Sequence, residues 1–133
     1  GLKATWHEFK GNKCSEIEKA PVNGTYPVED VMIPKKVKGN IGLIIKGYFN
    51  APQDDIYTFA LLSDDGSTLT IDSEQIVDND GPHGPKEIVG QKALAKGYHP
   101  MELRYFDQNG GQLKLKVTGS DGKEIPFTHL YAH

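Results

Sequence analysis

The 133-residue sequence has one cysteine, no long apolar run and no excess of positive charge. Because Cys14 is alone, an internal disulfide and a zinc site built from cysteines of this chain are excluded. The net charge is −3 and the lysines are scattered instead of clustering beside aromatics, so we expect no nucleic-acid partner. No apolar run approaches the length of a membrane span, so we expect no membrane insertion.

The usual signatures of catalysis are also missing. The sequence contains no Gly-x-Gly-x-x-Gly fingerprint and no phosphate-binding Gly-Lys-Ser/Thr loop. Its five histidines lack close ligand spacing, and His83 has no Cys or Ser partner nearby in the sequence. Asp64 and Asp65 are adjacent, whereas the two carboxylates of a glycosidase come from separate elements about 5 to 9.5 Å apart. We therefore expect this domain not to be an enzyme.

Fifteen glycines and eight prolines interrupt the chain at short intervals. The apolar runs between them are too short for typical helices and favour strands. Hydrophobic and polar residues alternate over Met101–Tyr105 and again over Gln112–Val117, which is the pattern of half-buried strands. The Asn109-Gly110 pair between them favours a hairpin, so we expect these two strands to pair.

Two longer apolar runs, Leu43–Phe49 and Ile56–Leu62, are expected to be central core strands. Shorter strands are expected at Thr68–Asp72 and Glu74–Val77, and the turn residues of Asp78–Pro85 predict a surface loop.

The first thirty residues contain Pro21 and Pro27 and are expected to form a looser arm. This arm would add an edge strand at Leu2–Glu8, with Trp6 as a packing residue. The length fits one domain over residues 1–133. Strands at this spacing predict an all-β fold, an antiparallel β-sandwich or a barrel-like single domain.

Acidic residues concentrate in the connections, at Asp54–Asp55, Asp64–Asp65, Asp78–Asp80 and Asp107–Asn109. Calcium takes roughly six to eight oxygen ligands, and such loops could supply them. Asp and Asn also mark turns by bonding nearby backbone, which accounts for any one loop without a metal. Neighbouring strand side chains point to opposite faces, so one cation could be shared by Asp64 and Asp65 only through an unusual backbone such as a cis peptide.

Several short blocks follow one another in the order and approximate spacing of one known family: Gly47–Pro52, Tyr57–Phe59, Ser63–Asp72, Val77–Gly81, His83, Leu94, Lys96–Pro100 and Arg104–Phe106. Over about residues 38 to 118 the chain resembles the PA14 domain family, which is named for protective antigen. Any single block would be ordinary turn chemistry, so the resemblance rests on their order.

The resemblance implies a β-sandwich or barrel-like fold and an accessory role. Members occur in bacterial glycosidases and other secreted enzymes, in yeast flocculins and adhesins, and in toxins, and sugar recognition is their commonest proposed task. It therefore implies a glycan-binding module without catalytic activity in an extracellular, cell-surface or periplasmic protein. A parent such as a β-glucosidase or β-hexosaminidase would make a catalytic domain of the same polypeptide a second partner.

In lectin members an Asp-Asp pair joined by a cis peptide binds calcium, and the calcium binds sugar hydroxyls. By position, Asp64 and Asp65 would be that pair, as metal ligands and as sugar-binding residues. The lectins add an asparagine and backbone carbonyls from the loop before the last strand, here Asp107–Gly111. Asp107 or Asn109 would supply that metal ligand, and Asn109 would also contact the sugar. The bulky residue that the lectins place on this loop is replaced by glycines.

Two other functions stay open. A structural or protein-contact module would pack as a spacer against a catalytic domain, with an exposed apolar patch and no metal at Asp64 and Asp65. A stand-alone hydrolase would need two separated carboxylates in a cleft or a nucleophile beside a base, and the sequence shows neither. His83 and Asp72 are expected to be mainly structural.

Overall fold

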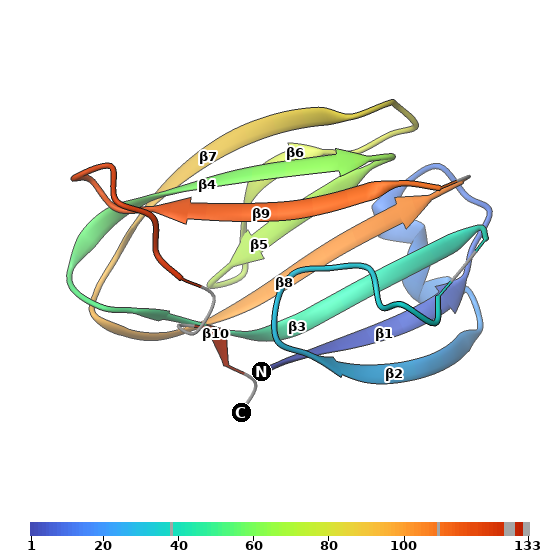
Figure 1. Ribbon diagram of the computed structural model, residues 1–133, viewed down its shortest axis with the longest axis horizontal. Coiled ribbons are helices and arrows are strands. Elements are labelled where there is room, and N and C mark those ends of the chain that lie inside the picture. Colours follow the sequence, from blue (N-terminus) through green and yellow to red (C-terminus); the bar gives the residue numbers. More distant parts are fainter. Residues whose placement is uncertain (38, 109, 127–129, 132–133) are drawn as a thin grey trace.

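The protein is a sandwich of two antiparallel sheets, which confirms the all-β prediction (Figure 1). The computed structural model describes residues 1–37, 39–108, 110–126 and 130–131. The elements in chain order are β1 (Leu2–Glu8), the 3-10 helix η1 (Cys14–Lys19), β2 (Val22–Val28), β3 (Ile41–Ala51), β4 (Asp55–Asp64), β5 (Ser67–Ile71), β6 (Glu74–Asn79), β7 (Lys86–Leu94), β8 (Gly97–Asp107), β9 (Gln112–Thr118) and β10 (Leu130–Tyr131). In the part of the chain that is described, no helix is long and apolar enough to cross a membrane.

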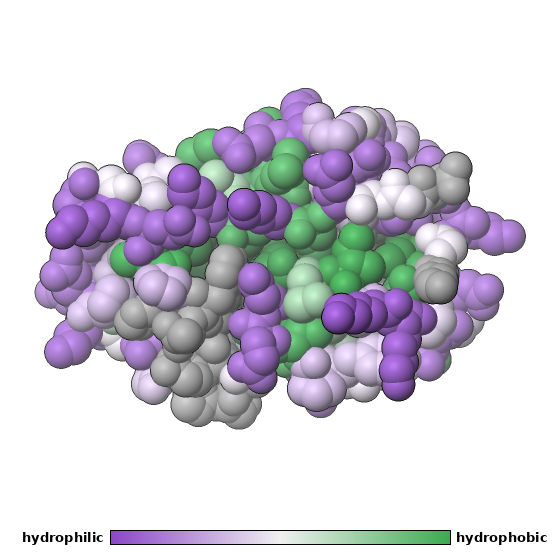
Figure 2. Space-filling view, in the orientation of Figure 1, coloured by the Kyte–Doolittle hydropathy of each residue, from purple (hydrophilic) through white to green (hydrophobic). Residues whose placement is uncertain are grey.

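The larger sheet has seven strands in the order β2-β1-β3-β8-β5-β6, and the short β10 also pairs with β3. The smaller sheet has the order β7-β4-β9. The two longest apolar runs of the sequence are β3 and β4, and each lies in the interior of its own sheet, as the sequence predicted. Figure 2 shows a band of apolar residues between the two sheets, with hydrophilic residues on either side.

Aromatic side chains join the two sheets at the centre of the core. Phe49 of β3 contacts Tyr57 and Phe59 of β4 edge to face, with ring centroids 5.3 and 5.6 Å apart. All three side chains are fully buried. Such pairs contribute about 0.5–1.5 kcal/mol beyond the burial of their area. These contacts hold the two sheets against each other beneath the loops.

The predicted hairpin between Met101–Tyr105 and Gln112–Val117 is wrong. β8 pairs with β3 and β5, whereas β9 pairs with β4 in the other sheet. The alternation itself is confirmed, because Leu103 and Leu115 are both buried in the core. A period of two identifies the buried face of a strand but not its neighbour. The connection after β8 therefore crosses from one sheet to the other.

The N-terminal segment is also better ordered than predicted. β1 pairs with β2 on one side and β3 on the other, so it is an interior strand and β2 is the edge. Pro27 lies in β2, where an edge strand tolerates the missing N–H. Trp6 packs against the core from β1, as a packing residue should.

A second hydrophobic cluster lies on the outer face of the larger sheet, under η1. It comprises Phe9, Cys14, Ile17, Ile44 and Phe106. Burial raises the pKa of the Cys14 thiol, and the nearby Asp80 carboxylate raises it further. The thiol is therefore a protonated packing group at physiological pH.

The sequence did not predict β7, because Gly90 and Lys92 lie between Ile88 and Leu94 on its inward face and interrupt the apolar period. At Gly90 a Cβ atom would lie 2.0 Å from the carbonyl oxygen of Ile76 in β6. The close approach of β6 and β7 therefore requires glycine at this position.

Gly90→Ala should force β6 and β7 apart and lower the free energy of unfolding by about 1–3 kcal/mol. Chemical denaturation measures the change. Gly84→Ala is the matched control, because a Cβ at Gly84 meets nothing within 4 Å. The control should change stability by less than about 0.5 kcal/mol. Equal losses in the two variants would contradict the contact.

Candidate functional site

Asp64 and Asp65 lie where the chain leaves the smaller sheet and enters the larger one. β4 ends at Asp64, and β5 begins at Ser67. The peptide bond between Asp64 and Asp65 is cis, as the resemblance implied. A Cβ at Gly66 would lie 2.5 Å from the Phe106 ring and 2.7 Å from the carbonyl oxygen of Gly81. Only glycine fits this crossover without displacing its neighbours.

The carboxylate of Asp65 binds two other loops at the same end of the sandwich. Its Oδ1 accepts the backbone N–H of His83 at 3.1 Å. Its Oδ2 accepts the backbone N–H of Gln108 at 3.0 Å. His83 follows β6 and Gln108 follows β8, so one side chain joins three connections that are distant in the sequence.

The loop from Asp107 to Gln112 packs against the aspartate pair from the other side. Tyr105 donates its hydroxyl hydrogen to the carbonyl oxygen of Asp64 at 2.7 Å. A Cβ at Gly111 would lie 2.0 Å from that oxygen, 2.3 Å from the Tyr105 hydroxyl and 2.9 Å from the carboxyl carbon of Asp107. This crowding accounts for the glycine at position 111.

Negative charge gathers around the Tyr105 hydroxyl. Burial raises the pKa of this hydroxyl, and the charges of Asp107, Asp64 and Asp65 raise it further. The hydroxyl therefore keeps its hydrogen and remains a donor to Asp64. The same effect shows that the three carboxylates share one region of the molecule, although two of them precede Asp107 by more than forty positions.

The structure thus brings together three of the four predicted metal ligands, Asp64, Asp65 and Asp107, whereas Asn109 lies outside the described residues. Asp64 and Asp65 are half-buried, and Asp107 is 5% exposed. The Asp64 carboxylate has no hydrogen bond or ion pair with any residue that the structure describes, and Asp107 does have a partner.

The donor set suits a hard cation. Within the described ranges, no three His, Cys, Asp or Glu side chains form a group that could hold a metal ion. Calcium, however, also takes main-chain carbonyls, amide oxygens and water beside its carboxylates. The nearest imidazole, His83, has both ring nitrogens against carbonyl oxygens, at 2.8 Å from Asn79 and 2.7 Å from Gly84. The carboxylates of Asp64, Asp65 and Asp107, which lie around the Tyr105 hydroxyl, are donors of the kind that calcium takes.

The sequence placed Asp78–Pro85 in a surface loop, but Asn79 ends β6 and is 2% exposed. Its amide donates to the carbonyl oxygens of Lys86 at 2.8 Å and Leu61 at 3.2 Å. It thereby links β6 to β7 and β4 directly behind the site. No local signal marks this role, since Asn beside Asp and Gly resembles a turn.

His83 and Asp72, which were expected to be mainly structural, both make contacts within the fold. Asp72 pairs with His99 at 2.8 Å in the turn after β5.

The chain matches the family model described as the PA14 domain over residues 1–127. It belongs to the PA14 domain family. The match is longer than the stretch from 38 to 118 on which the resemblance rested, and it includes β1 and β2. No curated protein sequence matches the chain.

Solved structures of the same fold include a PA14 sugar-binding domain from an RTX adhesin, with a TM-score of 0.83 and 16% identity over 100% of this chain and 98% of that one. The epithelial adhesin 6 A domain from Candida glabrata, in complex with Galβ1-3GlcNAc, has a TM-score of 0.72 and 12% identity over 100% and 87%. The β-glucosidase from Kluyveromyces marxianus, in complex with glucose, has a TM-score of 0.69 and 17% identity. The alignment covers 96% of this chain but 16% of that enzyme. At these identities the likeness establishes the fold.

Tyr105→Phe should lower the free energy of unfolding by about 1–3 kcal/mol, because the carbonyl oxygen of Asp64 loses its donor. Tyr26→Phe is the matched control, since the Tyr26 hydroxyl has no hydrogen bond with the described residues. It should cost less than about 0.5 kcal/mol. Denaturation of the two variants measures the difference, and equal costs would show that the Tyr105 hydroxyl does not hold the crossover.

Proposed function

We propose that this domain binds glycans through a calcium-assisted site formed by Asp64, Asp65 and the 107–111 loop, and that it catalyses no reaction. The observation that carries the proposal is the position of Asp64. Its carboxylate is half-buried at the meeting point of three loops and has no partner among the described residues. A carboxylate in such a place is suited to an external cation.

Calcium, when bound, supplies a positive charge whose remaining coordination positions accept sugar hydroxyls. The residues of this chain prepare the place for it. Asp65 holds the loops after β6 and β8 with its two oxygens, and Tyr105 fixes the Asp64 main chain. Asn109 is proposed as a further ligand and sugar contact by its position in the sequence. Asp107 is proposed either as a further calcium ligand or as a negative charge beside the bound calcium.

Solved structures of the same fold support a sugar as the ligand of this domain. One is described as a sugar-binding domain of an adhesin, and another was solved with Galβ1-3GlcNAc. The fold also forms a small part of a β-glucosidase. We therefore propose an accessory module of an extracellular, cell-surface or periplasmic protein, with a glycoside hydrolase as the parent and its catalytic domain as a neighbour.

A spacer that contacts another domain is the second candidate. Ile56 of β4 and Val89 of β7 are each 53% exposed, and their strands pair in the smaller sheet. Exposed apolar side chains on one sheet suit such a contact. This function requires neither calcium nor sugar. A titration with calcium and glycans therefore separates the two candidate functions.

Asp64→Asn should weaken calcium binding at least about tenfold and abolish calcium-dependent glycan binding, because calcium loses a charged ligand. Calorimetry with calcium and a glycan panel that includes Galβ1-3GlcNAc measures both. Without calcium, stability should change by less than about 0.5 kcal/mol, since the Asp64 carboxylate supports no described contact.

Asp121→Asn is the control, because Asp121 is exposed in the turn after β9, at the opposite end of β4. It should leave both affinities unchanged. Absence of calcium-dependent binding in the unmodified protein, or equal binding by Asp64→Asn, would contradict the proposed site.

A further inference from the structure

The outer face of the larger sheet carries a shallow trough that lies away from the aspartate site. Two adjoining hollows of about 420 and 260 Å³ share Lys3 of β1 and Lys46 of β3. The larger one extends to Thr70 and Glu102, and the smaller one to Thr5 and His7, with other residues completing each wall. We call this surface the sheet trough.

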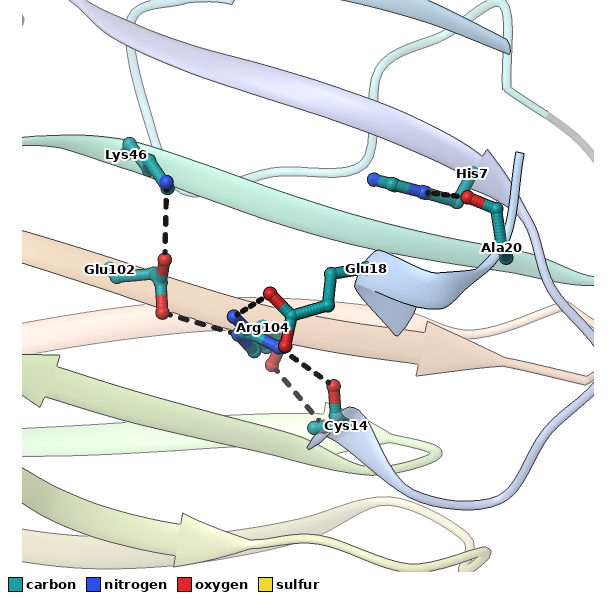
Figure 3. A network of polar contacts seen from close by, with 7 residues as sticks. All are labelled: His7, Cys14, Glu18, Ala20, Lys46, Glu102 and Arg104. Carbon is teal, nitrogen blue, oxygen red and sulfur yellow. Dashed lines mark hydrogen bonds and ion pairs between the residues drawn. The ribbon is translucent and has the colours of Figure 1, made fainter. Parts of the chain in front are cut away.

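The charges of the sheet trough are not balanced. Lys3 and Lys46 lie directly opposite each other in the β1–β3 pair, an arrangement that like charges destabilise. Lys46 lies 3.5 Å from Glu102, which also accepts Arg104 at 3.1 Å, and Arg104 in turn contacts Glu18 at 3.4 Å (Figure 3). Glu102 lines the larger hollow, whereas Arg104 and Glu18 lie beside it and pair with each other. Lys3 has no ion pair among the described residues and leaves one positive charge over.

His7 adds a second kind of recognition. It is 4% exposed, and its Nδ1 lies 3.0 Å from the carbonyl oxygen of Ala20. A carbonyl can only accept, so Nδ1 carries the hydrogen and Nε2 of the neutral ring is an acceptor. In Figure 3 the second nitrogen points away from Ala20. Because His7 and Thr5 both line the smaller hollow, hydroxyl-binding groups lie beside the lysine pair.

The dimensions and composition favour a small ligand over a protein. The larger hollow falls within the range of about 300–1,000 Å³ that small-molecule sites occupy. Protein interfaces are depleted in lysine, whereas Lys3 and Lys46 line both hollows of this surface. Pro100 is exposed, lines the larger hollow and offers apolar atoms to the C–H face of a sugar ring.

We propose that the sheet trough binds an acidic saccharide unit, a uronate or a sulfated sugar, with Lys3 and Lys46 holding the anionic group and His7 and Thr5 contacting hydroxyls. The proposal extends glycan binding to a second surface, and it requires neither calcium nor Asp64.

Calorimetry of the whole chain in EDTA tests the proposal with trigalacturonate beside its methyl ester, and with a sulfated disaccharide beside its unsulfated form. At least one acidic probe should bind, and its neutral counterpart should bind at least about tenfold more weakly. The Lys3→Ser/Lys46→Ser variant should lose the binding. Its thermal midpoint should change little, because the variant removes the like-charged Lys3–Lys46 pair together with the exposed Lys46–Glu102 ion pair.

Lys114→Ser/Lys116→Ser is the matched control, because both lysines are exposed on β9 in the other sheet. It carries the same change in net charge and should bind as the unmodified protein does. Equal loss in the two double variants would overturn the proposal, as would failure of every acidic probe or equal binding of the neutral forms.

Two further outcomes separate this surface from its alternatives. Binding that disappears in EDTA or in Asp64→Asn would belong to the calcium site, which supports the proposed function but overturns the trough. Polyglutamate bound as tightly as trigalacturonate would identify an acidic peptide ligand and overturn the saccharide. Failure of the calcium titration leaves the trough experiment intact, since that experiment runs without calcium.

Discussion

The carboxylate of Asp65 is the interaction on which the end of this sandwich depends. It accepts two backbone N–H groups, one from the connection after β6 and one from the connection after β8. Charged acceptors make stronger hydrogen bonds than neutral ones. Because Asp65 itself lies on the crossover between the sheets, a single side chain sets the relative position of three loops. The neighbouring Asp64 is thereby held at their meeting point.

Behind this carboxylate, buried polar groups fix the main chain. Asn79 links β6 to β4 and β7, and Tyr105 holds the carbonyl of Asp64. Gly66 and Gly111 allow approaches that no side chain would permit. The aromatic contacts of Phe49 keep the two sheets at a fixed separation. The loops can therefore vary in chemistry on a closely packed frame, which is how one fold carries different binding functions.

Sequence patterns predicted the buried faces well and the strand neighbours poorly. The alternation at Met101–Tyr105 and Gln112–Val117 identified inward residues correctly, but a local Asn-Gly turn signal cannot distinguish a hairpin from a crossover between sheets. The sequence did not predict β7 because Gly90 and Lys92 interrupt the apolar residues of its inward face. The prolines of the first thirty residues predicted a looser arm. Pro27 instead lies in β2, an edge strand, where the missing N–H is tolerated.

The sequence blocks of the family carried Asp64 and Asp65, and the ligand roles of these residues, of Asp107 and of Asn109 stay predictions. The supporting roles of Asn79 and Gly111 depend on residues far away in the sequence, so no local pattern could have revealed them.

The central claim is that Asp65 organises the loops around Asp64. Amide hydrogen exchange at His83 and Gln108 tests it most directly, in the unmodified protein, in Asp65→Ala and in Asp64→Ala. Both amides should exchange faster together in Asp65→Ala and keep their protection in Asp64→Ala. Unchanged protection in Asp65→Ala, or an equal loss in both variants, would contradict the account.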